Sequence, residues 1–140
     1  MSKVLPPTDE SPLVLGARLY PGVQFQEGVR DDLLVKLAED CTKLLTRKGP
    51  RGYRRDGHPQ WDARYREIRS KLQMKAVEVT AQADANLADA PEEVIVRNLY
   101  DAWRQSSGHW GVVSKPHKRY GDWIGVTKGG IWYGTIIVAD

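Results

Sequence analysis

The chain has little of what marks the specialised protein classes. Its 140 residues include a single cysteine, which cannot form an internal disulfide, so stability must come from packing. No apolar run approaches the about 20 residues that a membrane helix needs, so no membrane insertion is expected. The opening stretch MSKVLPPTDESP lacks the apolar core and the cleavage pattern of a secretory signal, which predicts a cytoplasmic or virion-associated protein.

An excess of one charge is also absent. Twenty-one basic and eighteen acidic residues leave a net charge of +3, which is too small to indicate nucleic-acid binding by itself. The basic residues are nevertheless clustered in two stretches, RKGPRGYRR and KPHKR. Such clusters can bind phosphates, but solvated loops carry the same residues, so nucleic acid is a disfavoured partner. The candidate basic patch consists of Arg47, Lys48, Arg51, Arg54, Arg55, Lys115, Lys118 and Arg119.

What remains is the composition of one globular domain, with 41% hydrophobic and 28% charged residues. Residues 1–28 contain several prolines and no sustained helical periodicity. This pattern predicts an extended arm outside the core, with one short strand near residues 13–19. Residues 29–140 are expected to form the folded domain.

Apolar residues recur at steps of three and four in three segments, which predicts three amphipathic helices. The first carries acidic residues at its start and basic residues at its end, as the helix dipole favours. Its Cys41 falls on the apolar stripe and is interpreted as a small core residue. The predicted helices are 31–47, ended by Gly49-Pro50; 59–73; and one that starts near Asp89 and stops by Gly108.

The C-terminal part changes to strand-like patterns. Residues 123–127 and 131–138 are β-rich and are joined by Lys128-Gly129-Gly130, which predicts a hairpin. Both faces of the second run are apolar, so helices should cover the sheet on both sides. Residues 74–82 are either a strand or an extended turn. The predicted fold is therefore α+β: a three-layer α/β/α sandwich with a small antiparallel sheet between helices.

Three side chains are candidates for a cleft. His58 and His109 each stand at a predicted helix boundary, and Glu78 lies in an otherwise apolar segment, where a buried carboxylate needs a partner. Two imidazoles and a carboxylate can bind a divalent metal such as zinc, with water completing the shell. They can equally form a hydrogen-bonded trio without an ion. His109 is thus either part of the chemistry of a cleft or a polar plug in the core.

Several motifs follow one another in a distinctive order. A Leu and Ala stripe over residues 34–45 precedes His58 and Glu78; AWRQSSGH then ends at His109, and YGDWIGV and GGIWYGTIIV close the chain. This order resembles the CAP superfamily (SCP domain), which includes cysteine-rich secretory proteins, venom antigens and plant pathogenesis-related proteins. The likeness is to the short bacterial- or phage-like branch and spans about residues 31–140.

The resemblance implies a CAP-like three-layer sandwich for residues 29–140, with a cleft where His58, Glu78 and His109 converge. In relatives this cleft sometimes binds zinc or another divalent ion. Two positions depart from the family pattern. Val79 follows Glu78 where Asn is usual, and Gln105 lies near the place of a second acidic residue. Fewer ligands imply weaker metal binding.

Three functions are considered in order. The first is a non-enzymatic CAP-like binding module that joins a larger protein assembly, such as a virion or phage tail, through residues 1–28. The second is a metal-dependent hydrolase in which a cleft ion and Glu78 activate water. The third is nucleic-acid binding by the basic loops, with Tyr53 and Tyr120 as stacking groups. No oxyanion-hole motif is evident, so no catalytic residue is assigned.

Overall fold

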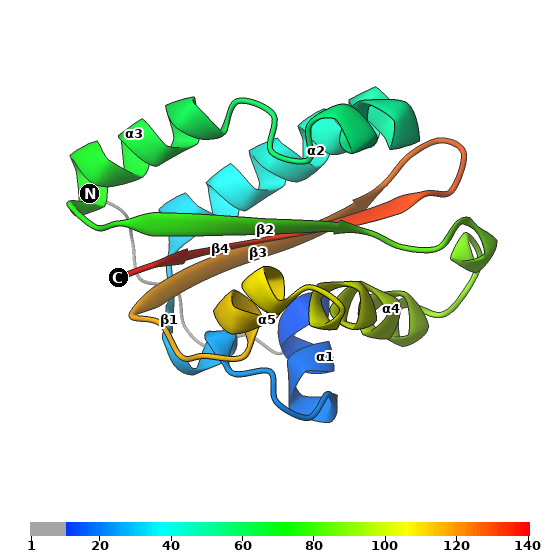
Figure 1. The fold of residues 1–140 in the computed structure, drawn as a ribbon, viewed down its shortest axis with the longest axis horizontal. Helices are drawn as coiled ribbons and strands as arrows, with labels where there is room; N and C mark the ends of the chain where they lie inside the picture. The colour runs from blue at the N-terminus through cyan, green and yellow to red at the C-terminus, as the bar shows by residue number, and fades with distance from the viewer. Residues whose placement is uncertain (1–10) are drawn as a thin grey trace.

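A four-stranded sheet forms the middle layer of the computed structural model, which describes residues 11–140 (Figure 1). The strand order is β1-β3-β4-β2. The predicted antiparallel pairing is found among the last three strands, whereas β1 runs parallel to β3. The sheet is therefore mixed rather than purely antiparallel. The sequence did not predict β1, because a strand of two residues is too short to show alternation. The strands are β1 Val29–Arg30, β2 Ala76–Gln82, β3 Arg119–Val126 and β4 Trp132–Ala139.

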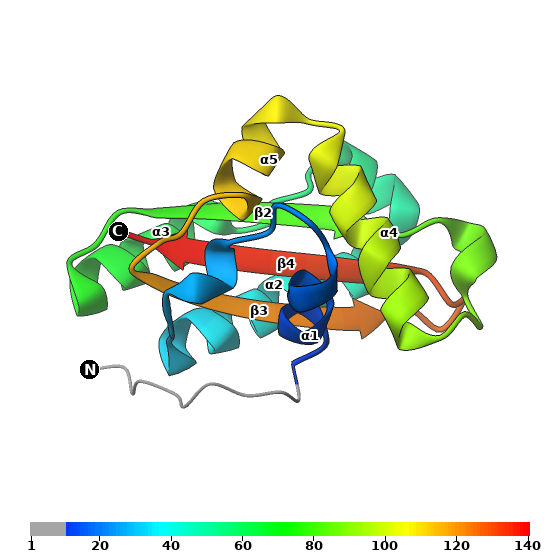
Figure 2. The same ribbon diagram turned by 90° about the horizontal axis from the view of Figure 1, so that it is seen from below.

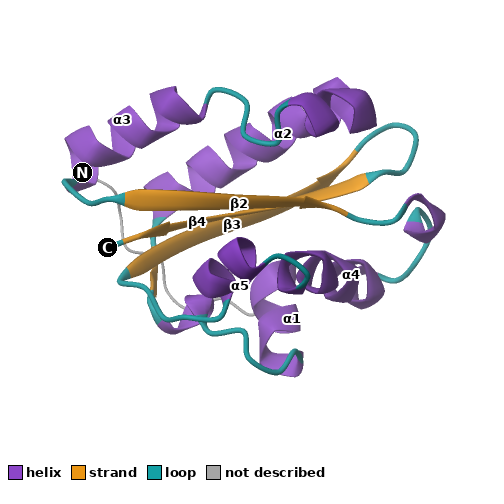
Figure 3. Ribbon diagram, viewed as in Figure 1, coloured by secondary structure: helices purple, strands orange, loops and turns teal. Residues whose placement is uncertain are grey.

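Helices cover both faces of this sheet, so the protein has the predicted α+β sandwich architecture (Figure 3). One face carries α2 and α3, and the other carries α1, α4 and α5. No helix within residues 11–140 is both long and apolar enough to cross a membrane. The helices are α1 Pro12–Leu19, α2 Asp32–Arg55, α3 Trp61–Leu72, α4 Glu92–Arg104 and α5 Ser107–Val113, with short turns at Phe25–Glu27 and Ala85–Leu87.

The hairpin of β3 and β4 is confirmed and lies at the centre of the fold (Figure 2). Both faces of β4 are buried, as the sequence predicts. Ile136 and Val138 pack toward α1 and α4, whereas Ile137 and Ala139 pack toward α2 and α3. One strand thus contributes to both hydrophobic layers.

The first predicted helix, α2, begins where the sequence indicates. The carboxylate of Asp31 accepts the backbone N–H groups of Leu33 and Leu34. The expected end at Gly49-Pro50 is wrong, since α2 continues to Arg55 through a kink. Gly49 has φ 69° and ψ −172°, and Pro50 then takes the first position of a new helical turn, where its missing N–H costs nothing.

The N-terminal prediction is also wrong for residues 11–28. Residues 13–19 belong to helix α1 rather than to a strand, and Leu13 and Phe25 are completely buried in the core. The tyrosine hydroxyl of Tyr100 on α4 donates to the carbonyl oxygen of Leu13. The segment PLVLGARL is apolar on nearly every side, so it has no single stripe for a periodicity argument to detect. Residues 1–10 of the predicted arm lie outside the described residues.

The third predicted helix, α4, ends at Arg104, ahead of the expected limit. A further helix, α5, follows at once, and Ser106 caps it by accepting the backbone N–H of His109 at 3.4 Å. His109 therefore lies in the first turn of a helix and not in a loop.

Candidate functional site

Glu78 lies on β2, the edge strand beside β4. Alternation along β2 directs Val79 and Ala81 into the core beside α1 and α4. Glu78 instead points to the side of α2 and α3, where only 1% of its side chain is exposed. A carboxylate that is buried to this degree must be compensated by nearby donors.

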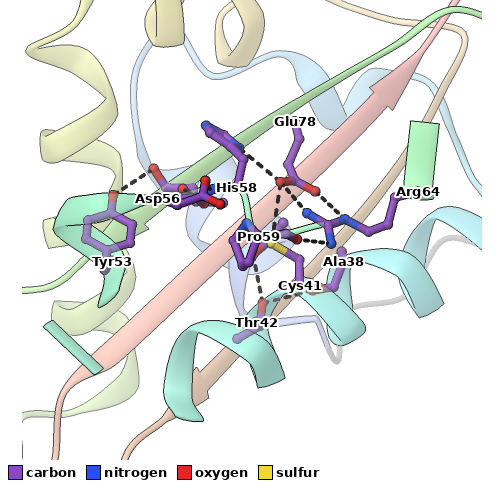
Figure 4. A network of polar contacts seen from close by, with 12 residues as sticks. Ala38, Cys41, Thr42, Tyr53, Asp56, His58, Pro59, Arg64 and Glu78 are labelled. Atoms are coloured by element: carbon purple, nitrogen blue, oxygen red, sulfur yellow. Dashed lines mark hydrogen bonds and ion pairs between the residues drawn. The ribbon is translucent and has the colours of Figure 1, made fainter. Parts of the chain in front are cut away.

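Arg64, from α3, supplies most of that compensation (Figure 4). Its Nε donates to Oε2 of Glu78 and its Nη2 to Oε1, both at 2.8 Å, in the forked geometry that suits a guanidinium and a carboxylate. Its Nη1 donates to the carbonyl oxygen of Pro59 at 2.6 Å. Burial alone would lower the pKa of Arg64, but the contact with Glu78 outweighs it and raises the pKa on balance.

His58 is the second partner of Glu78. Its Nδ1 lies 2.9 Å from Oε1 of the carboxylate, which can only accept, so Nδ1 carries the proton. Its backbone N–H donates to Oδ1 of Asp56 at 2.9 Å, which fixes the loop between α2 and α3. The side chain is 39% exposed. His58 therefore connects the buried ion pair to the surface.

Cys41, from α2, completes the surroundings of the carboxylate. Its Sγ lies 3.4 Å from Oε1 of Glu78. Burial and the negative charge of Glu78 raise the pKa of Cys41 to about 12. The thiol therefore stays protonated at neutral pH and is a donor rather than a nucleophile.

His109 approaches from the opposite layer. It lines a pocket of about 270 Å³ at the edge of β2, and its pKa is lowered by burial and by the charge of His58. Within the described residues, no hydrogen bond joins His109 to Glu78. The structure thus brings two of the three predicted residues, His58 and Glu78, into contact, whereas His109 lines a pocket that includes neither of them. Other residues lining the pocket are Tyr53, Thr80, Gln82, Trp103 and Ser106.

A metal ion has no ready ligand set here. Across residues 11–140, no three His, Cys, Asp or Glu side chains are grouped so that they could hold one. Both oxygens of Glu78 already accept hydrogen bonds from Arg64. A cation that used this carboxylate would have to displace, or lie next to, a guanidinium.

The eight basic residues do not form one patch, contrary to the expectation. Arg119 donates to Oδ2 of Asp31 at 2.6 Å, which places it at the start of α2, whereas Arg47 lies near its kink. The two positions are separated by about 24 Å along a straight helix. Figure 1 shows α2 running from β1 toward the turn that joins β3 and β4. The sequence could show the clusters but not the length of helix between them.

Sequence reasoning missed Arg64, although a signal for it exists. Arg64 follows Trp61 by three residues and precedes Ile68 by four, so it falls on the buried side of α3. A charged residue on an apolar stripe and a carboxylate in an apolar strand predict each other as partners. The interval of fourteen residues between Arg64 and Glu78 gave no local motif.

Comparison of this chain with protein-family models, with curated proteins and with solved structures finds no match. The resemblance to the CAP superfamily therefore remains a prediction from the sequence, and function has to be argued from the site itself.

Proposed function

We propose that this protein is a non-enzymatic binding module that works within a larger protein assembly. One observation carries the first half of this proposal: the carboxylate of Glu78 is engaged on both oxygens by Arg64 and on one of them also by His58. A general base or a metal ligand needs a lone pair directed at its target. The oxygens of Glu78 instead accept hydrogen bonds from side chains of the same protein.

The alternative function, a metal-dependent hydrolase, would require this arrangement to open. Releasing Glu78 for a metal ion or a water molecule would leave Arg64 buried without its counter-charge, which is strongly unfavourable. The partly exposed ring of His58 and the pocket lined by His109 are suited to hydrogen bonding with a polar ligand. The cleft therefore supports recognition better than it supports catalysis.

The second half of the proposal, membership of an assembly through the N-terminal region, is supported by α1. This helix buries one side in the core, yet it also leaves Leu15 and Leu19 exposed at 41% and 80%. Large aliphatic side chains adjacent on a short helix are typical of a contact surface. The attachment region predicted within residues 1–28 would include this outer side of α1.

The non-enzymatic function can be tested by thermal unfolding with and without an excess of zinc. We expect the unfolding temperature of the wild-type chain to stay unchanged, because a metal that bound the native cleft would raise it. The same chain should not hydrolyse a panel of peptide and ester substrates. A zinc-dependent rise that His58→Ala abolishes, accompanied by hydrolysis that His109→Ala abolishes, would establish the hydrolase instead.

A further inference from the structure

Helix α1 is apolar on both of its sides. Leu13, Val14 and Ala17 face the core and are buried. The opposite side carries Leu15 and Leu19, four residues apart and on one stripe. A helix that is hydrophobic all round is normally covered all round. Considering residues 11–140, the outer stripe of α1 is left largely uncovered, with Leu19 80% and Leu15 41% exposed.

The outer stripe forms one wall of a groove, and the first turns of α4 form the other. Figure 2 shows α1 and α4 next to each other on the same face of the sheet. The groove has a volume of about 550 Å³. Gly16 allows the two helices to approach closely, because a Cβ atom at this position would lie 2.3 Å from Cγ1 of Val96. The groove is lined by Pro12, Leu15, Gly16, Leu19, Pro91 and Val96, with charged residues at its rims.

The charges at the two rims differ in sign. Glu92 and Glu93 are exposed on the α4 side, and Arg18 lies on the α1 side. An occupant would be oriented by this difference, because a basic residue is favoured toward α4 and disfavoured toward α1. The groove is therefore suited to an apolar ridge with a positive charge on one flank.

The size of the groove decides what kind of occupant it can hold. Helix α1 has eight residues and is about 12 Å long. Contact along such a short helix buries much less than the roughly 1,200 Å² that stable dimers need. A second copy of this chain is therefore disfavoured. A helix of two or three turns from another protein matches the length of α1.

We propose that the groove between α1 and α4 binds a short amphipathic helix of a partner protein. This helix carries leucine-sized side chains three and four residues apart, and a lysine or arginine that faces Glu92 and Glu93. The proposal rests on the proposed function as an assembly component and names the surface by which the module joins its partner. Binding of this kind places the apolar side of a helix in a groove and uses the flanking charges for orientation.

The test uses the full-length chain and a synthetic helical peptide with leucines at three- and four-residue steps and lysines on one flank. We expect saturable binding, measured by fluorescence anisotropy of the labelled peptide. Leu19→Asp should weaken it by at least about tenfold, as expected for an anchor residue. Val126→Asp is the control, because Val126 is also an exposed aliphatic residue but lies on β3 and does not line the groove. Leu19 is largely exposed, so unchanged thermal unfolding of its variant is expected.

A second measurement tests whether Glu92 and Glu93 favour a basic residue on the bound helix. A peptide with glutamates in place of the lysines should bind the wild-type chain more weakly. The double variant Glu92→Lys, Glu93→Lys should reverse this preference. Equal binding of both peptides by the wild-type chain, or no loss with Leu19→Asp, would overturn the proposal. So would concentration-dependent self-association that Leu19→Asp abolishes, because the occupant would then be a second copy.

These outcomes are separable from failure of the proposed function. Zinc binding and hydrolysis depend on His58 and His109, which lie at the edge of β2 and not in the groove. Peptide binding together with hydrolysis would contradict the non-enzymatic function and keep the docking surface. Absence of both peptide binding and hydrolysis would reject the docking surface and leave the non-enzymatic function standing.

Discussion

Glu78 illustrates how a charge in an apolar strand is accommodated. Its neighbours on three different elements each provide a donor: Cys41 on α2, His58 in the following loop and Arg64 on α3. None of these residues is adjacent to Glu78 in sequence. The carboxylate therefore holds together the layer of the sandwich formed by α2 and α3, whatever else the cleft binds.

The first prediction concerns this ion pair. Arg64→Met removes the guanidinium and leaves Glu78 buried without its counter-charge, so we expect a loss of about 3–5 kcal/mol in the free energy of unfolding. The double variant Arg64→Met, Glu78→Leu should recover most of that loss, because it leaves no unpaired charge. Urea unfolding of the two single variants and the double variant gives the coupling energy. A double variant no more stable than Arg64→Met would show that the ion pair is not the source of the loss.

The second prediction distinguishes the two readings of His109. Trp103 is completely buried, and among residues 11–140 its indole Nε1 has no hydrogen-bond partner, so packing alone holds it. Trp103→Ala should destabilise the protein by about 3–5 kcal/mol. His109→Ala should cost much less, since its ring lines an open pocket. Denaturant unfolding measures both, and equal losses would support the interpretation of His109 as a polar plug.

At the scale of elements, the kink in α2 depends on a backbone conformation that only glycine adopts easily. Gly49→Ala should destabilise the protein by about 1–3 kcal/mol, because φ 69° with ψ −172° strains any residue with a Cβ atom. Nothing lies within 4 Å of the added methyl group, so no steric clash contributes. Gly111→Ala is the control: it lies inside α5 with equally open surroundings, and should stabilise by about 0.5–1 kcal/mol. A neutral Gly49→Ala would mean that the kink relaxes.

The elements that could be predicted from sequence are those with a clear period. α2, α3 and α4 each bury one apolar stripe, and the strands of the hairpin are β-rich runs joined by a glycine-containing turn, so the sequence predicts three helices and two strands. α1 has two apolar sides and α5 has only seven residues, so neither shows such a stripe. The candidate site, too, could be predicted only where the sequence pattern itself is unusual. The sequence identified His58, Glu78 and His109 as unusual, but Arg64 depends on how α3 packs against β2, which is a tertiary effect.

At the scale of the whole molecule, the N-terminal segment closes one face of the sheet. The side chain of Ser11 contacts the carboxylate of Asp122, which also accepts a hydrogen bond from Arg30 at 3.2 Å. Asp122 is fully buried on β3, and burial raises its pKa in spite of these partners. The contacts join the start of α1 and strand β1 to the central hairpin. Residues 11–28 are therefore a structural part of the domain, although the sequence predicted an arm.

Removal of residues 1–28 tests this organisation. The deletion exposes the apolar residues on which Leu13 and Phe25 pack, so we expect loss of cooperative unfolding, monitored by circular dichroism and urea titration. Two substitutions on α1 serve as a matched pair, since they change the same residue type on opposite sides of one helix. Leu13→Ala, at a completely buried position, should cost about 2–5 kcal/mol, whereas Leu15→Ala, at an exposed position, should stay within about 0.5 kcal/mol. A deletion variant that still unfolds cooperatively, with Leu13→Ala near neutral, would restore the arm as a separable attachment and place the core in residues 29–140 alone.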